Sequence, residues 1–293
     1  MQVYFDQDLV VRYGGRGPRY TSYPTALQFN DELTADVYRA KARESNDSDV
    51  PLSLYVHIPF CHSLCYYCGC NKIVTRNEER VARYMEMLYR EIEMQSELFD
   101  RGRLIEQLHF GGGTPTYLDK PQLAALMEHL RASFTFDESD EREFSIEVDP
   151  RTVDAERIRE LWDLGFNRLS LGIQDFNEDV QKAVNRAQSP AEVQALMDSA
   201  RESGFGSISF DLIYGLPHQT VESFDKTIDI VIAMQPDRLA VYNYAHLPQR
   251  FKGQRMINAD DIPAPETKLD LLHHTIDKLC DAGFIYIGMD HFA

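Results

Sequence analysis

Short apolar, β-rich runs alternate with longer amphipathic segments along most of the chain, from Pro51 onward. The β-rich runs predict strands over 52–58, 107–110, 144–148, 168–173, 208–213, 239–244 and 284–287. The amphipathic segments predict helices over 80–99, 120–133, 155–164, 190–203, 221–234 and 265–282. Several of these helices begin at a capping residue or a proline and end at a glycine, such as Gly204. The alternation is a β-α repeat.

A β-α repeat folds into a parallel sheet with right-handed crossovers. Six or seven units favour an α/β barrel, complete or partial. Gly111–Gly113 follow a predicted strand but lack the spacing and the immediate helix of a dinucleotide-binding turn. Residues 1–50 are polar and rich in turn formers, with one helical stretch near 35–44. We therefore expect an N-terminal arm over 1–50 and a barrel over 51–293.

Among the features of the composition, the net charge excludes the largest number of possible partners. The 293 residues include 30 Lys and Arg against 47 Asp and Glu, which gives a formal net charge of −17. Such a surface repels nucleic acids and anionic membranes, so we expect neither as a partner. No run reaches the ~18 apolar residues that a membrane span needs, and residues 1–8 show no signal-peptide pattern. We expect a cytoplasmic protein.

Four of the five cysteines are concentrated between Cys61 and Cys70. Three of them have the spacing C-x3-C-x2-C and directly follow the first predicted strand, where α/β barrels place their chemistry. Thiolates this close together are typical ligands of iron–sulfur clusters or of zinc. The spacing favours a cluster, because structural zinc sites usually take two separated pairs of ligands and the chain has no second cysteine pair. Structural zinc stays the alternative.

With Tyr67 just before its third cysteine, this motif resembles the signature of the radical S-adenosylmethionine (SAM) superfamily. The additional Cys70 and several further motifs resemble, more narrowly, the oxygen-independent coproporphyrinogen III oxidases (dehydrogenases) of anaerobic haem synthesis. The further motifs are GPRYTSYP (17–24), YVHIPF (55–60), GCNKI (69–73), FGGGTPTY (110–117), SIEVDPR (145–151), NRLSLGIQDF (167–176), DLIYGLP (211–217), YNYAHLP (242–248) and GMDHF (288–292). The resemblance covers nearly the whole chain.

The resemblance implies a partial (β/α)6 barrel of the TIM type, followed in the family by a helical C-terminal domain. We expect this chain to be truncated before that domain. The implied cofactors are a [4Fe-4S] cluster and SAM, as one molecule or two. The implied reaction is a radical SAM oxidative decarboxylation that converts two propionates of coproporphyrinogen III to vinyl groups and gives protoporphyrinogen IX. The reaction needs a low-potential electron donor and no O2, and we expect the protein to be a monomer.

The resemblance also implies a ligand set and candidate catalytic residues. Cys61, Cys65 and Cys68 are implied as the cluster ligands, and they leave the fourth iron open for SAM. Cys70 is implied as a cysteine that does not bind the cluster and lies toward the active site. Glu147 ends a predicted strand, where its carboxylate can accept hydrogen bonds from a ribose or an ammonium group. With Tyr55, Cys70 and Glu147 form the candidate catalytic set.

Further positions are implied as contacts of the cofactor. Gly112 is implied to touch the cluster-bound SAM, since glycine lets the backbone approach a ligand closely. Tyr55 and Tyr67 are implied as walls of the two SAM sites. Contacts of a second SAM are implied for Gly113, Thr114, Gln174, Arg186, Asp211 and the backbone of Ala245.

Histidines and the N-terminal arm complete the candidate residues. We expect His57 to be a hydrogen-bonded neighbour of the cluster loop rather than a ligand, and His273 and His274 to be surface residues. Arg19, with Tyr20 and Tyr23, is expected to cover the mouth of the substrate site, because a tetracarboxylate needs cations on an acidic protein.

Two other functions compete with this interpretation. A haem chaperone of the same superfamily also carries C-x3-C-x2-C, but it typically lacks the cysteine at the position of Cys70 and the GPRYTSYP arm. Both features are present in this chain. The other alternative is an inactive fragment, whose barrel is intact but whose closing domain is missing.

Overall fold

Six parallel strands form the centre of one curved sheet in the computed structural model, which describes residues 5–13 and 28–293. The strands are β1 (Leu52–Ile58), β2 (Phe60–Cys61), β3 (Ile73–Val74), β4 (Leu104–Gly112), β5 (Thr135–Phe136), β6 (Glu143–Val148), β7 (Arg168–Gln174), β8 (Ser207–Tyr214), β9 (Arg238–Asn243), β10 (Tyr286–Gly288) and β11 (His291–Phe292). The main sheet has the order β1-β4-β6-β7-β8-β9-β11-β10, with β5 beside β4, and β2 and β3 pair separately. Strands β1 to β9 of this order are parallel, so their carboxyl ends share one edge.

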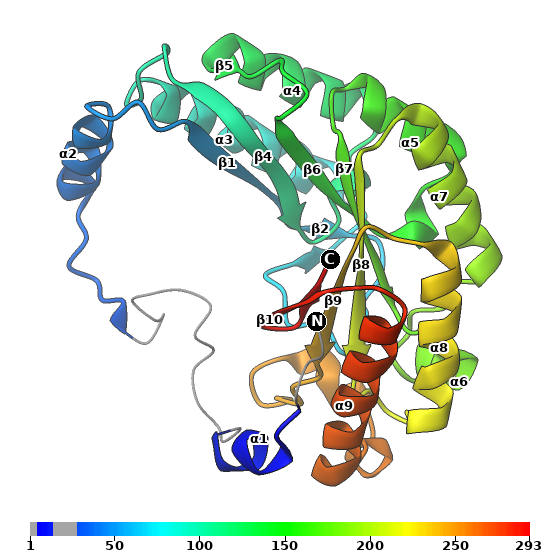
Figure 1. Ribbon diagram of the computed structural model, residues 1–293. Coiled ribbons are helices and arrows are strands. Elements are labelled where there is room, and N and C mark those ends of the chain that lie inside the picture. The colour runs from blue at the N-terminus through cyan, green and yellow to red at the C-terminus, as the bar shows by residue number, and fades with distance from the viewer. Residues whose placement is uncertain (1–4, 14–27) are drawn as a thin grey trace.

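Helices cover the outer face of the sheet, which curls into an open ring (Figure 1). The α-helices are α1 (Gln7–Tyr13), α2 (Ala35–Ser45), α3 (Glu78–Ser96), α4 (Lys120–Ser133), α5 (Ala155–Asp163), α6 (Glu178–Ala183), α7 (Pro190–Ser203), α8 (Val221–Met234) and α9 (Pro265–Asp281). Short 3-10 helices span Pro115–Tyr117, Pro150–Thr152, Lys252–Met256 and Ala259–Asp261. The parallel strands with their outer helices confirm the predicted partial α/β barrel.

Capping residues explain why three helices have the predicted bounds. Asp119 and Ser189 begin α4 and α7 with reciprocal capping boxes, in which the side chain of the third helical residue returns a hydrogen bond to the cap. Thr220 does the same for α8. Gly204 ends α7 with a φ of 107°, a left-handed conformation that glycine adopts without a steric penalty.

The prediction of a further strand of the repeat over 284–287 was wrong in position and direction. Strand β10 covers Tyr286–Gly288 and pairs antiparallel with β11, which in turn pairs antiparallel with β9. The physical reason is a tight turn at Met289 and Asp290, which both have positive φ and reverse the chain. The ring therefore ends in a hairpin rather than in a seventh parallel strand.

The hydrophobic core lies between the sheet and the outer helices. Alternate residues of each strand point outward into it, among them the fully buried Phe110 on β4 and Phe210 on β8. Phe166, which precedes β7, packs edge-on against Phe110, and Phe224 of α8 is also fully buried. The remaining strand residues face the inside of the ring, and many of them are polar.

The N-terminal residues contribute little to this core. Helix α2 confirms the predicted helical stretch and buries only Ala42. Arg103 holds its end by donating hydrogen bonds to the carbonyl oxygens of Ser45 and Val50. The candidates Arg19, Tyr20 and Tyr23 lie outside the described residues. Within residues 5–13 and 28–293, no helix combines the length and apolar character needed to cross a bilayer.

The two expected surface histidines lie on α9. His273 is exposed and stacks on Phe5 at 4.3 Å between ring centroids. His274 is partly buried and pairs with Asp225 of α8.

Candidate active site

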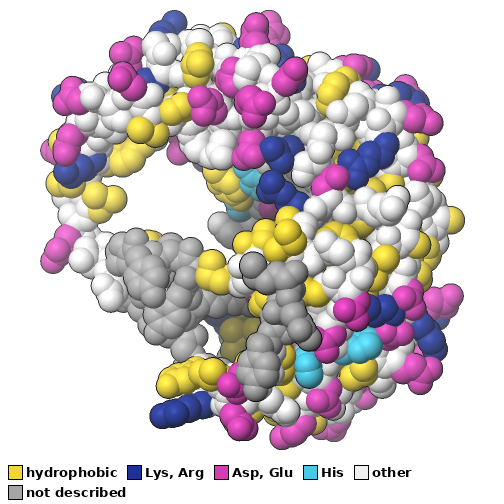
Figure 2. All heavy atoms as spheres, viewed as in Figure 1, with side chains coloured by type: hydrophobic (Ala, Val, Ile, Leu, Met, Phe, Trp, Pro, Cys, Tyr) yellow, Lys and Arg dark blue, Asp and Glu magenta, His cyan; other side chains and the backbone are white. Residues whose placement is uncertain are grey.

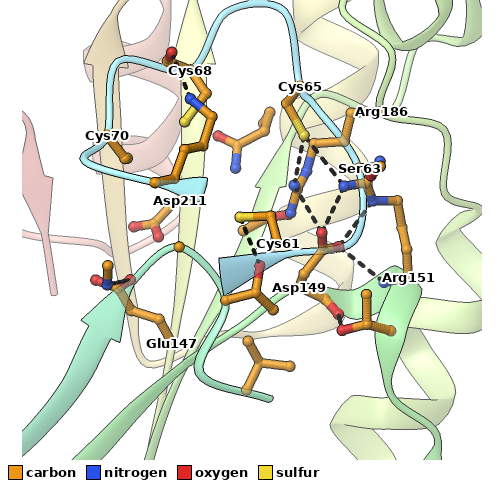
Figure 3. A pocket seen from close by; sticks show the side chains of 18 of the residues that line it. Cys61, Ser63, Cys65, Cys68, Cys70, Glu147, Asp149, Arg151, Arg186 and Asp211 are labelled. Carbon is orange, nitrogen blue, oxygen red and sulfur yellow. Dashed lines mark hydrogen bonds and ion pairs between the residues drawn. The ribbon is translucent and has the colours of Figure 1, made fainter. Parts of the chain in front are cut away.

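A cavity of about 280 Å³ opens at the shared carboxyl edge of the parallel strands (Figure 3). The cysteine loop after β1 forms one wall, and residues of β4, β6, β7 and β8 and of the loops that follow them form the others. The predicted site residues that line it are Cys61, Cys65, Tyr67, Cys68, Cys70, Gly112, Gly113, Thr114, Glu147, Gln174, Arg186 and Asp211. Residues from widely separated parts of the sequence thus meet in one cavity.

The cysteine loop is held by bonds to distant parts of the chain. Its first cysteine lies in β2, which pairs with β3 beyond the loop, so both ends of the loop are fixed together. The Tyr66 N–H donates to the carbonyl of Val184, and the side chain of Asn185 donates to the carbonyl of Leu64. Gln254 donates to the carbonyl of Tyr67. The thiols are therefore positioned by the folded barrel and not by the loop alone.

Two guanidinium groups point at the Cys65 sulfur. Arg151 Nη2 lies 3.3 Å and Arg186 Nη1 lies 3.4 Å from Sγ. Both arginines also bind the carboxylate of Asp149, which lies 2.6 Å from Arg151 and 3.3 Å from Arg186. Burial alone raises the pKa of Asp149, but the hydrogen bond from Arg151 and the charge of Arg186 bring it below its ordinary value. Asp149 therefore stays ionised and holds both cations beside the thiol.

The other thiols of the loop differ in their surroundings. Burial raises the pKa of the Cys61 thiol, whose sulfur accepts a 3.5 Å hydrogen bond from Thr114. A hydrogen bond from Cys70, with the nearby ammonium of Lys72, lowers the pKa of the Cys68 thiol to about 5. The same hydrogen bond raises the pKa of Cys70, which acts as the donor. The hydrogen bond thus favours ionisation of Cys68 over ionisation of Cys70.

Glycines at the end of β4 let the backbone approach the cavity. Gly112 has a φ of 118°, and a Cβ there would come within 2.6 Å of the His57 ring. A Cβ on Gly113 would lie 2.6 Å from the carbonyl oxygen of Pro59. Only glycine fits at either position without displacing its neighbour.

Glu147 is held at the cavity wall by its neighbours on the inner face of the sheet. Its Oε2 accepts a 3.1 Å hydrogen bond from the Gly112 N–H, and its Oε1 lies 3.2 Å from His109 Nε2. His109 Nδ1 lies 2.6 Å from the Ser145 hydroxyl. One face of the Glu147 carboxylate stays open, since 42% of the side chain is exposed.

Asp211 lies on the inner face of β8, close to Glu147. The Ser170 hydroxyl donates to its Oδ2 at 3.1 Å. Burial and the negative charge of Glu147 raise the pKa of Asp211 from 3.8 to about 6. Gln174, at the end of β7, has a φ of 68°, a strained conformation for a residue with a Cβ.

These residues fit the cluster implied by the motif. Cys61, Cys65 and Cys68 surround one space, with Cys70 displaced toward Glu147 and Asp211 (Figure 3). Nowhere in the described part of the chain do three His, Cys, Asp or Glu side chains gather closely enough to hold a single metal ion. Thiols placed around a cavity and cations beside Cys65 suit an anionic polynuclear cluster better than a tetrahedral zinc ion.

Two predicted residues lie outside this cavity wall. Tyr55 is 58% exposed and stacks on His109, and its hydroxyl lies 3.0 Å from His57 Nδ1. Ala245 is exposed, and its carbonyl accepts from Gln254 at 3.1 Å. His57 Nε2 lies 2.9 Å from the Asn71 carbonyl of the cysteine loop. This hydrogen bond agrees with the expected place of His57 next to the loop.

Sequence reasoning missed Asp149 and Arg151, which bind each other and Cys65. Their signal was the Asp-Pro-Arg run directly after the third predicted strand, at the edge where parallel sheets collect functional side chains. It also missed His109, whose place on the inner face follows from the alternation along β4 once the direction of Phe110 is known.

Comparison with known proteins gives the same picture over the whole chain. The chain is 53% identical over 289 residues to the oxygen-independent coproporphyrinogen III oxidase of Pseudomonas aeruginosa, covering 99% of this chain and 63% of that protein. It is 52% identical over 293 residues to the protein of the same name from Escherichia coli, again covering 63% of it. The chain thus spans about 63% of the length of these curated relatives.

A solved structure and a family model agree with these relatives. The structure of coproporphyrinogen III oxidase (HemN) from Escherichia coli, described as a radical SAM enzyme, superposes with a TM-score of 0.92 and 49% identity, covering 100% of this chain and 65% of that chain. The model of the Radical SAM superfamily matches residues 55–231. This span takes in the cysteine loop, the glycine edge and the strands that carry Glu147 and Asp211, and on this evidence the chain belongs to the radical SAM superfamily.

Proposed function

We propose that this chain carries out the oxidative decarboxylation of two propionates of coproporphyrinogen III, as part of anaerobic haem biosynthesis. The observation that carries the proposal is a cysteine-lined cavity in a chain that matches, over its full length, proteins named coproporphyrinogen III oxidase. Because the chain spans 63% of those relatives, substrate and activity are inferred from them.

The cofactors of the proposed reaction are a [4Fe-4S] cluster and SAM. Cys61, Cys65 and Cys68 would hold the cluster, and the same cavity would take SAM beside it. When bound and reduced, this pair supplies the radical chemistry that removes a hydrogen atom from an unactivated carbon. Arg151 and Arg186 balance the negative charge of the thiolate at Cys65, which they contact at 3.3 and 3.4 Å.

The residues of the glycine edge orient the cofactor. Gly112 would let the backbone approach the bound SAM closely, and its place beside the His57 ring leaves no room for a Cβ. Glu147, fixed by the Gly112 N–H and by His109, offers its open oxygen face to a hydroxyl or ammonium donor of the cofactor. Cys70, which donates a hydrogen bond to Cys68, does not bind the cluster and is proposed to lie toward the reacting substrate. Tyr67 contributes an aromatic wall of the cavity, and Tyr55, which lies outside that wall beside His109, is proposed to contact SAM from there.

A second SAM accounts for the need to convert two propionates. Its proposed contacts are Gly113, Thr114, Gln174, Arg186, Asp211 and the backbone of Ala245. All of them except Ala245 line the same cavity as the cysteines, which supports a shared site.

The remaining partners follow from the charge and from the chemistry. A low-potential donor supplies the electron, since Fe–S potentials extend down to about −700 mV and cleavage of a sulfonium needs the low end. The net charge of −17 argues against nucleic acid and anionic membrane as partners. A cytoplasmic monomer with an arm over 1–50 and a barrel over 51–293 completes the proposal.

Anaerobic reconstitution with iron and sulfide tests the proposed function. After dithionite reduction, SAM and coproporphyrinogen III are added, and 5′-deoxyadenosine and the decarboxylated product are measured. We expect both products from the unaltered chain. Cys65→Ala should abolish the bound cluster, whereas the matched variant Cys70→Ala should keep its iron and sulfide but lose the decarboxylated product.

Three other outcomes would contradict the proposal. Cleavage of SAM without loss of carboxyl groups would agree with a radical SAM enzyme but contradict coproporphyrinogen III as the substrate. Stoichiometric haem binding without decarboxylation would favour the chaperone. Binding of one zinc ion in place of iron and sulfide would show that the cysteines form a zinc site and not a cluster site.

A further inference from the structure

A second cavity, of about 630 Å³, fills the inside of the open ring below the cysteine loop. It shares Glu147, Ser170, Asp211 and Tyr242 with the first cavity, so the two form one continuous space. Figure 2 shows basic and histidine side chains gathered on the inner wall of the ring. A volume of this size is in the range of sites for small organic molecules.

The wall of this inner cavity is polar because of strand alternation in an unclosed barrel. Residues on one side of each strand pack under the helices, and those on the other side face a space too wide for side chains to fill. On β8 the inward set is Ser207, Ser209 and Asp211, and on β9 it is Arg238, Ala240 and Tyr242. The inner face therefore presents hydroxyl and charged groups to whatever binds there.

Two arginines line the inner cavity, and they differ in their partners. Arg168 on β7 is bound by Glu143 at 2.6 Å, and Glu143 also accepts from Gln107 at 2.9 Å. Arg238 is exposed to the cavity and forms no ion pair with any residue of 5–13 or 28–293. Its chain neighbour Asp237 is already engaged by Arg201 at 2.8 Å.

An uncompensated cation inside this protein is unusual, because acidic residues exceed basic ones by 17. Hydrogen-bonding groups stand next to it. Ser209 is the register partner of Arg238 on the adjacent strand, so both side chains point inward at the same level. His291 lines the same cavity, and its Nδ1 donates to the Met289 carbonyl at 2.6 Å.

We propose that Arg238, with Ser209 beside it, forms an anion subsite that binds one carboxylate of the substrate inside the ring. The proposal rests on the proposed function, because coproporphyrinogen III carries four carboxylates and only two of them react. A guanidinium binds a carboxylate through two parallel N–H donors, which fixes both distance and orientation. A carboxylate held at Arg238 anchors the macrocycle in the inner cavity while another propionate reaches the shared wall of Glu147 and Asp211.

The test is binding of coproporphyrin III, the stable oxidised form of the substrate, to the reconstituted chain by anaerobic fluorescence titration. Arg238→Gln should weaken binding about 10- to 100-fold, the usual effect of losing one charge-assisted hydrogen-bonded pair. The matched control Arg159→Gln makes the same change of charge on the exposed outer face of α5 and should change the dissociation constant less than twofold. Added guanidinium ion should partly restore binding to Arg238→Ala. It should not increase the affinity of Arg159→Ala, which is expected to bind as tightly as the unaltered chain.

Separate measurements distinguish this subsite from the proposed function. Iron content and SAM affinity should be the same in Arg238→Gln as in the unaltered chain, which shows that the variant folds. A change below twofold in Arg238→Gln, or an equal loss in Arg159→Gln, would overturn the subsite while leaving the proposed function intact. No binding of coproporphyrin III by the unaltered chain would overturn the proposed function and the subsite with it.

Discussion

Replacing Asp211 by Asn should make the cluster-free chain more stable at neutral pH. The Asp211 carboxylate is partly buried and lies near Glu147, and these two effects raise its pKa from 3.8 to about 6. A raised carboxylate pKa means that the ionised form is less favourable in the folded state than in the unfolded chain. Asn keeps an oxygen that accepts the Ser170 hydrogen bond but carries no charge.

The pKa shift sets the magnitude of this gain. Since one pKa unit corresponds to 1.36 kcal/mol, the shift sets an upper limit of about 3 kcal/mol, and water that reaches the partly buried carboxylate reduces it to about 1–3 kcal/mol. The folded state binds the extra proton between pH 3.8 and about 6, so the cost of Asp211 develops as the pH rises through this window and is complete above pH 7. At pH 5 the gain should be about half its value at pH 7.5.

Urea denaturation of the cluster-free chain, followed by far-UV circular dichroism, measures this effect. Asp211→Asn is compared with Asp270→Asn, which changes an exposed carboxylate on α9 and should alter the free energy of unfolding by less than about 0.5 kcal/mol at either pH. The reasoning is refuted if Asp211→Asn does not stabilise the chain at pH 7.5, or if its gain is the same at pH 5. A stabilised variant with lower activity would show that the site keeps a costly charge for its function.

Three further substitutions test the site edge, a buried network and the core by urea denaturation. Gly112→Ala should destabilise the chain by about 1–3 kcal/mol, since Ala is strained at a φ of 118° and contacts the His57 ring, and an unchanged free energy of unfolding would contradict that contact. Thr227→Val removes a 2.6 Å hydrogen bond to the buried Asp175 carboxylate and should cost about 1–3 kcal/mol, whereas Thr227→Ser should cost less. Phe210→Ala in the core should cost about 3–5 kcal/mol, and a loss below 1 kcal/mol would mean that the cavity collapses.

The sequence predicts the repeating part of the fold well because its signals are local. Helix α4 begins after Asp119 and α7 after Ser189, and each cap satisfies backbone donors through bonds within four residues. Strands such as β1 are apolar runs long enough to show a period. By contrast, β2 and β3 are two residues each, and their pairing depends on a loop closing between them.

The sequence predicts site residues that lie in a recognisable motif, but it does not show contacts between residues that are far apart in the chain. The spacing of Cys61, Cys65 and Cys68 indicates a shared site. The place of Gly112 after a predicted strand indicates a close approach of the backbone to a ligand. Arg151 lies in the Asp-Pro-Arg run after a strand, but that run does not show its contact with Cys65, which joins residues 86 positions apart. Such contacts arise only when the strands of the sheet bring their ends together.

The sequential order of the parallel strands has a consequence for how the protein is made. Because each β-α unit pairs with the one synthesised before it, the sheet can grow from one side as the chain leaves the ribosome. Cys65 is made early, yet its partner Arg186 follows 121 residues later. At 5–20 residues per second this interval lasts about 6–24 s, during which the thiols lack their cationic wall. The nascent cysteine loop therefore depends on a reducing environment until the barrel has grown around it.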